Sequence, residues 1–77
     1  MNQIALVTGA GQGLGQHFCA SLLRAGYSVV ITDIKLEAAQ ACARQLDPGG
    51  ERSLALQLDA GSKADFEGGL DQVLARF

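Results

Sequence analysis

Apolar residues along this chain fall into short runs of two different periodicities. Residues 4–8 (IALVT) and 28–33 (SVVITD) are nearly unbroken apolar runs rich in β-branched residues. Such runs are typical of parallel strands that are covered on both faces. Residues 53–59 (SLALQLD) instead alternate, with Leu54, Leu56 and Leu58 on one side. This alternation predicts a third strand with one face more exposed than the other.

The two segments between these runs carry apolar residues at helical spacing. In the first segment the stripe consists of Leu14, Phe18, Leu22 and Ala25, with Cys19 and Leu23 beside it. Gly26 follows at the position where a left-handed glycine commonly ends a helix. The second helix is predicted from Leu36 to Leu46, with its stripe at Leu36, Ala39, Ala43 and Leu46. The sequence DPGG at 47–50 ends it and predicts a turn.

A third helix is expected after the last strand. Ser62 and Asp65 have the spacing of a capping box, although aspartate is a weaker choice than glutamate at the second position. The apolar stripe behind them is Phe66, Leu70, Val73, Leu74 and Phe77. Two glycines, Gly68 and Gly69, interrupt this helix, and each should cost about 1 kcal/mol relative to alanine. We interpret the pair as a site of close packing or a kink.

Strands and helices therefore alternate as β-α-β-α-β-α within 77 residues. This order predicts an α/β fold of parallel strands joined by helical crossovers. The expected product is a single domain that forms half of a Rossmann-type doubly wound fold, with a three-stranded parallel sheet in the order 3-2-1 and flanking helices. The first strand would then lie at an edge of the sheet, with its hydrogen-bonding groups open to pairing.

The composition narrows the environment and the partners. The chain is 48% hydrophobic and 18% charged with a net charge of −2, and its isoelectric point is near 5.0. These values argue against nucleic acid or an anionic membrane as a partner. Two separated cysteines fit reduced thiols better than a metal motif or a disulfide framework. With no apolar run of membrane-spanning length and no signal-like start, we expect a soluble cytoplasmic protein.

The stretch TGAGQGLG at residues 8–15 predicts a phosphate-binding loop between the first strand and the first helix. Glycines there allow a tight turn and a close approach of phosphate to backbone N–H groups at the positive end of a helix. A P-loop would need a glycine and then a lysine where Leu14 and Gly15 stand. The Gly-x-Gly-x-x-Gly fingerprint also fails in every register. The pattern that fits is Thr8-Gly9-x-x-x-Gly13-x-Gly15.

Asp33 ends the second predicted strand, 18 positions after Gly15. An acid at about this distance accepts hydrogen bonds from the ribose hydroxyls of a bound dinucleotide and repels a 2′-phosphate. The neighbouring positions that could reverse this preference, Gln12 and Ile34, are not basic. The sequence therefore predicts NAD(H) as the cofactor in preference to NADP(H).

VTGAGQGLG and the following AGYSVVITD resemble the amino-terminal segment of the short-chain dehydrogenase/reductase family. The resemblance covers the whole chain, because LQLDAGSKADFEGGLDQVLARF is similar to the family's third strand and the helix after it. It implies that three glycines shape the loop: Gly9, Gly13 and Gly15. It also implies that the backbone amide of Leu14 meets the pyrophosphate and that Gln12 lies beside the adenosine ribose.

The remaining contacts implied by the resemblance involve adenosine. Asp33 binds the ribose, Ile34 flanks the adenine, and Asp59 with Ala60 contacts the adenine edge. Asp59 also ends the third predicted strand, where open α/β sheets bind ligands.

The family's catalytic Tyr-x-x-x-Lys pair, its serine and its Asn-Asn-Ala-Gly element have no counterpart in this sequence. The only tyrosine is Tyr27, and the residue four positions later is Ile31. We therefore assign no catalytic residue and no metal ligand to this chain.

We expect the chain to be the NAD(H)-binding part of a longer oxidoreductase that acts on an alcohol or carbonyl substrate, and to be inactive alone. The resemblance implies a homo-oligomer for the complete enzyme. Two alternatives stay open: a stand-alone adenine-dinucleotide-binding or regulatory module without turnover, and a fragment that self-associates through its open edge.

Overall fold

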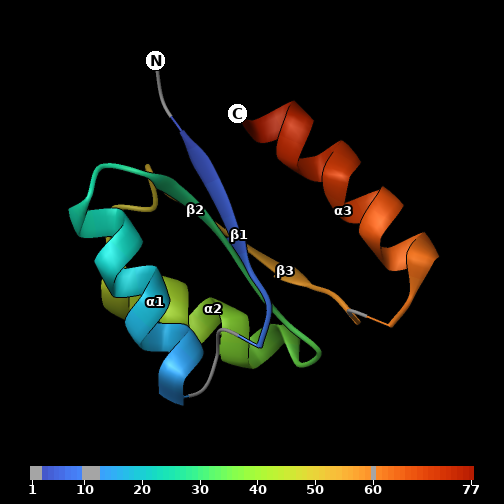
Figure 1. Ribbon diagram of the computed structural model, residues 1–77, viewed down its shortest axis with the longest axis horizontal. Helices are drawn as coiled ribbons and strands as arrows, with labels where there is room; N and C mark the ends of the chain where they lie inside the picture. Colours follow the sequence, from blue (N-terminus) through green and yellow to red (C-terminus); the bar gives the residue numbers. More distant parts are fainter. Residues whose placement is uncertain (1–2, 10–12, 60) are drawn as a thin grey trace.

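The computed structural model describes residues 3–9, 13–59 and 61–77. Three parallel strands form one sheet in the order β1 (Ile4–Val7), β2 (Ser28–Asp33), β3 (Ser53–Gln57). The strand β2 lies between β1 and β3 (Figure 1), and every residue of it is buried. The predicted order 3-2-1 is therefore confirmed, and β1 and β3 are the two edges within the described part of the chain.

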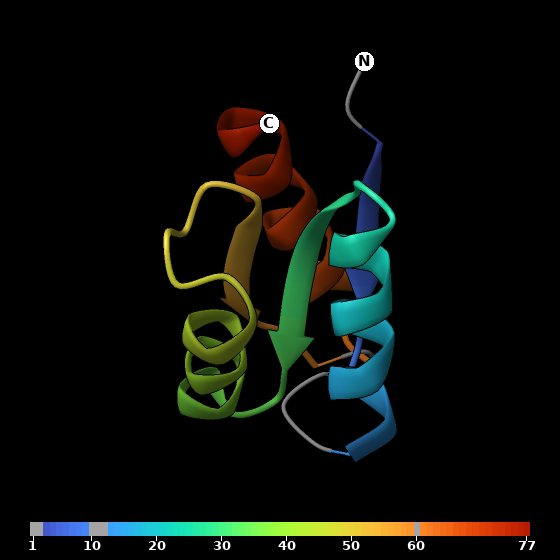
Figure 2. The same cartoon turned by 90° about the vertical axis from the view of Figure 1, so that its left-hand side faces the viewer.

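Three helices cover the two faces of this sheet (Figures 1 and 2). Helices α1 (Gly13–Arg24) and α2 (Leu36–Leu46) share one face, where their buried residues pack with Val29 and Ile31 of β2. Helix α3 (Lys63–Arg76) lies on the other face and packs with Val30 and Leu56. Alternate residues of β2 thus serve two cores, which explains why its sequence shows no alternation. None of these three helices has the length and apolar run needed to cross a membrane.

The carboxyl end of α1 has the geometry predicted from Gly26. The φ angle of Gly26 is +100°, and the N–H groups of Gly26 and Tyr27 donate to the carbonyl oxygens of Leu23 and Leu22 at 3.1 and 3.0 Å. This pair of bonds is a Schellman motif. The Arg52 guanidinium adds hydrogen bonds to the carbonyl oxygens of Leu23 and Tyr27, at 2.7 and 2.6 Å. Arg52, which directly precedes β3, therefore ties the start of β3 to the end of α1.

Two strands are shorter than the sequence pattern predicts. The first ends at Val7 instead of residue 8, and the third ends at Gln57 instead of residue 59. The ladder between β2 and β3 stops there because β2 ends at Asp33, which is in register with Gln57. Leu58 still donates its N–H to the carbonyl oxygen of Asp33 at 2.9 Å, and its side chain is buried. The apolar pattern thus continues past the end of the ladder.

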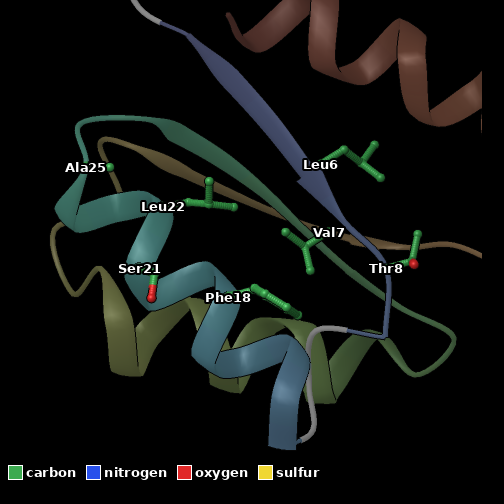
Figure 3. A pocket seen from close by; sticks show the side chains of 7 residues that line it. All are labelled: Leu6, Val7, Thr8, Phe18, Ser21, Leu22 and Ala25. Carbon is green, nitrogen blue, oxygen red and sulfur yellow. The ribbon is translucent and has the colours of Figure 1, made fainter.

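The apolar stripe predicted for α1 is only partly a core stripe. Cys19 and Leu23 are buried, whereas Leu14 and Phe18 are 70% and 56% exposed. The reason is the open edge of the sheet: β1 pairs only with β2, so α1 packs toward β2. Its outer side, with Phe18, faces a pocket beside β1 (Figure 3).

The two glycines inside α3 have different surroundings. A Cβ atom on Gly69 would lie 3.2 Å from Leu58 Cδ1 and 3.8 Å from Leu56 Cδ1. Close packing of α3 on the end of β3 therefore accounts for Gly69. A Cβ atom on Gly68 would meet nothing within 4 Å, and nothing in the structure explains this glycine.

Candidate cofactor site

The carboxyl ends of the three parallel strands lie at one edge of the sheet, and the predicted site residues follow these ends. Gly9 follows β1, Asp33 ends β2 with Ile34 next to it, and Asp59 follows β3. In open α/β sheets this edge is where ligands bind. Helix α1 also begins at this edge, with Gly13, Leu14 and Gly15 in its first turn. Gln12 and Ala60, which were also predicted to bind the cofactor, lie outside the described residues.

Backbone conformation, not crowding, requires glycine just after β1 and at the first residue of α1. Gly9 and Gly13 have φ angles of +62° and +41°, which side-chain-bearing residues rarely adopt. A Cβ atom at either position would meet no protein atom within 4 Å. The space beside both glycines is thus open in the described part of the chain. A phosphate group could approach the backbone there without displacing a side chain.

The amino-terminal end of α1 is suited to an anion. Its first turn (GLGQ) contains no acidic residue, whereas the first turns of α2 and α3 contain Glu37 and Asp65. The first N–H groups of a helix have no partners within the helix, and the helix dipole makes this end positive. The Leu14 side chain is 70% exposed. A pyrophosphate would therefore meet backbone amides without repulsion from an acidic neighbour in this turn.

Asp33 is held at the end of β2 in a defined position. Its carboxylate oxygen Oδ1 accepts a hydrogen bond from the backbone N–H of Lys35 at 3.0 Å, and the residue is only 5% exposed. Its backbone carbonyl accepts from Leu58 N–H. The turn after β2 thus fixes the carboxylate at the carboxyl end of the strand, where open α/β sheets bind ligands.

Ile34 presents an apolar surface next to this carboxylate. Its side chain is 61% exposed. Its carbonyl oxygen accepts a hydrogen bond from Gln57 Nε2 at 3.1 Å, which ties the turn to the end of β3. An exposed isoleucine on a fixed turn is suited to contact with the flat face of a base.

Asp59 organises the connection between β3 and α3. Its side-chain Oδ1 accepts from Gly61 N–H at 2.9 Å, and its own N–H donates to Asp65 Oδ2 at 3.0 Å. The predicted capping box is only half formed. Ser62 Oγ accepts from Asp65 N–H at 3.2 Å, but the Asp65 carboxylate binds Asp59 and not the Ser62 amide, which donates to the Asp59 carbonyl. Aspartate is one methylene shorter than the glutamate that usually completes this box.

Sequence reasoning missed one residue that supports the site. The Thr32 hydroxyl donates a hydrogen bond to the carbonyl oxygen of Val7 at 2.8 Å, and Thr32 is fully buried. This bond fixes the last residue of β1, from which the glycine loop departs. The available signal was a single polar residue near the end of an apolar run. The sequence does not reveal its partner, because the register of the two strands decides which backbone carbonyl lies beside the hydroxyl.

No group of three or more histidine, cysteine or acidic side chains converges within residues 3–9, 13–59 and 61–77. His17 is exposed on α1. The described residues at this edge therefore offer a fixed carboxylate, left-handed glycines and helix amides, which are groups that bind a nucleotide.

Comparison with known proteins agrees with this geometry. The sequence model of the short chain dehydrogenase family matches residues 3–77. Cyclohexanol dehydrogenase of Acinetobacter sp. is 33% identical over 76 residues, which are 99% of this chain and 30% of that protein. Human 15-hydroxyprostaglandin dehydrogenase [NAD(+)] is 35% identical over 97% of this chain and 29% of its own length.

The fold has close relatives among solved structures. The 3-ketoacyl-(acyl-carrier-protein) reductase of Brucella melitensis, complexed with NADH, superimposes with a TM-score of 0.86 at 30% identity. The match covers 96% of this chain and 29% of that one. The chain thus spans about 30% of the length of the relatives that it matches. Since the family model matches nearly every residue, this chain belongs to the short-chain dehydrogenase family.

Proposed function

We propose that this chain is the NAD(H)-binding part of an oxidoreductase that transfers hydride between nicotinamide and an alcohol or carbonyl substrate. The family binds a nicotinamide cofactor, and the relatives above are named as dehydrogenases or reductases. One observation carries the proposal: at the carboxyl ends of the strands lie the left-handed glycines, the start of α1 and the Asp33 carboxylate. The cofactor would donate or accept the hydride, and these residues would hold its adenosine and pyrophosphate.

The choice of NAD(H) over NADP(H) rests on the turn after β2. Asp33 would accept hydrogen bonds from the ribose hydroxyls, and its negative charge would repel a 2′-phosphate. Ile34, the next residue, offers no positive charge to offset that repulsion. Lys35 is close in sequence, but its backbone amide already holds the Asp33 carboxylate, and its side chain lies at the exposed start of α2. One relative is named for NAD(+) and another was solved with NADH, which supports the same choice.

The catalytic residues are proposed to lie outside residues 1–77, in the remainder of a longer polypeptide. The open edge of β1 supports this. A pocket of about 600 Å³ lies beside it, lined by Leu6, Val7 and Thr8 and by Phe18 and Leu22 of α1 (Figure 3). Apolar side chains at an unpaired strand edge are normally covered in a complete fold. We propose that the remainder of the enzyme covers them, and that the complete enzyme is a cytoplasmic homo-oligomer.

Amide chemical shifts measured during titration with NAD⁺ test the proposed site. We expect the shifted amides to be those of residues 13–15, 33–34 and 59, because these follow the carboxyl ends of the strands. Amides near Gly26 and Arg52, at the opposite ends of β2 and β3, should not move. Gly13→Val should weaken binding, since valine is strained at a φ angle of +41°. Gly68→Ala, which fills open space on α3, is the matched control. Shifts confined to another surface, or none at millimolar NAD⁺, would contradict the proposal.

A stand-alone binding module without turnover is the second candidate. It would bind NAD⁺ in the same way, so the titration does not separate the two. The intact mass of the natural gene product does. A product that is longer and contains Tyr-x-x-x-Lys supports the oxidoreductase, whereas a natural product of 77 residues supports the module.

A further inference from the structure

The hydroxyl of Thr32 serves a contact with β1 and not the packing of β2. Thr32 follows three apolar residues of this strand and is fully buried. A valine has nearly the same shape and suits a strand equally well, and burying a hydroxyl costs free energy unless it is hydrogen-bonded. The bond that Thr32 Oγ1 donates to the carbonyl oxygen of Val7, at 2.8 Å, offsets this cost.

Strand β1 has little else to hold its last residue. None of its four residues is buried, and it pairs only with β2 within the described part of the chain. Val7 is in register with Ile31, the residue before Thr32, so the hydroxyl acts where the ladder between the two strands ends. Gly9, two residues after Val7, already has a φ angle of +62°. The direction in which the glycine loop leaves the sheet therefore depends on how the Val7 carbonyl is held.

The other end of the glycine loop is fixed by a helix. Helix α1 begins at Gly13 and is anchored in the core by Cys19 and Leu23. A pyrophosphate needs backbone N–H groups in set positions, so the start of the loop must be fixed as well. Where only a fraction of the molecules has the loop in the binding conformation, the apparent affinity falls by that fraction.

We propose that Thr32 is a positioning residue for the cofactor: through the Val7 carbonyl, its hydroxyl holds the glycine loop in the conformation that binds the pyrophosphate. The proposal rests on the proposed function, because it requires a dinucleotide at this loop. It gives two adjacent residues different roles. Thr32 acts on the pyrophosphate, which NAD(H) and NADP(H) share, whereas Asp33 acts on the ribose, where the two cofactors differ.

Calorimetric titration of the wild-type protein and of Thr32→Val with NAD⁺ and NADP⁺ tests this division. Thr32→Val should bind both cofactors roughly fivefold to tenfold more weakly, the factor that one neutral hydrogen bond supplies. The ratio of the two affinities should stay unchanged. A changed ratio would mean that Thr32 acts through Asp33, and unchanged affinities would mean that the hydroxyl does not position the loop. Either result overturns the proposal and leaves the proposed function standing, whereas no binding by the wild type overturns both.

Two further variants separate the hydroxyl from packing. Thr32→Ser keeps the hydroxyl and loses a methyl group, so it should bind both cofactors as the wild type does. Ile31→Val removes one methylene from the core on the α1–α2 face of β2 and keeps the hydroxyl, so it lowers stability but should retain wild-type affinity. If either variant loses as much affinity as Thr32→Val, packing and not the hydroxyl is responsible, and the proposal is wrong.

The hydrogen bond itself can be measured without any cofactor. The ¹³C chemical shift of the Val7 carbonyl responds to the bond that it accepts. This shift should change in Thr32→Val and stay near its wild-type value in Thr32→Ser and Ile31→Val. An unchanged Val7 carbonyl in Thr32→Val would show that the hydroxyl does not hold it in solution, and would overturn the proposal whether or not the site binds NAD(H).

Discussion

At the scale of single residues, Asp33 shows what the spacing of residues along the chain can predict and what it cannot. Its place at the end of a strand, 18 residues after the last glycine of the loop, could be read from the sequence. Its low exposure and its bond to the Lys35 amide could not, because both depend on how the turn folds back against the strand. The same holds for Thr32, whose partner on β1 is 25 residues away. The spacing of residues predicts which residue stands at the end of a strand. The contacts of that residue depend on the register of the strands and on the turns between them.

Cys19 leads to a prediction about alkaline pH. Burial, followed by the neighbouring Cys42, raises the pKa of Cys19 from 9.0 to about 11 in the folded chain. Because the folded-state pKa lies above the unfolded value, this contribution to stability is complete below pH 9.0 and is lost as the pH rises toward about 11. Urea denaturation in a reducing buffer should show the free energy of unfolding falling across that range.

The double variant Cys19→Ala/Cys42→Ala is the control for this fall. Other groups also titrate above pH 9, and they remain in the variant. The wild-type protein should therefore lose more stability than the variant does between pH 9.0 and 11. Equal losses in the two proteins would show that the buried thiols are not responsible.

At the scale of elements, periodicity located all six helices and strands, while their ends depended on partners. The stripe at Leu36, Ala39, Ala43 and Leu46 belongs to a helix with the predicted bounds, because DPGG ends it locally. The end of β3 was overestimated, because a strand lasts only as long as its neighbour. Local stop signals are visible in a sequence, whereas the length of a neighbouring strand is not.

The two glycines of α3 lead to opposite predictions. Gly68→Ala should raise the free energy of unfolding by about 1 kcal/mol, because alanine favours the helix and meets nothing within 4 Å. Gly69→Ala gains the same helix propensity, but its Cβ would press against Leu58 Cδ1 at 3.2 Å and the core would have to shift. We expect it to be less stable than Gly68→Ala by about 1 kcal/mol or more. Urea denaturation of both variants measures this difference, and equal gains would contradict close packing at Gly69.

At the scale of the whole molecule, the fold class followed from the order of the elements, and the proposed position of the site rests on the same order. The sheet order 3-2-1 and the family assignment are both confirmed. What the pattern could not give is which apolar residues form the core. Phe18 lies on a helical stripe, yet it is 56% exposed beside the open edge of β1. An apolar stripe predicts that a helix face is buried. Which residues bury it depends on the complete set of strands and helices.

The central claim is that the edge formed by the glycine loop, Asp33 and Asp59 binds NAD(H). Calorimetric titration with NAD⁺ and NADP⁺ tests it most directly, applied to the wild-type protein and to Asp33→Ala/Ile34→Arg. Asp71→Ala, which removes one negative charge from the exposed side of α3, is the matched control. Hydrogen bonds to a charged group contribute about 1.5–3 kcal/mol, so the wild type and the control should bind NAD⁺ roughly tenfold to a hundredfold more tightly than NADP⁺. The double variant should reverse this order, since arginine pairs with the 2′-phosphate. Equal affinity of the wild-type protein for the two cofactors, or no binding of either, would contradict the account.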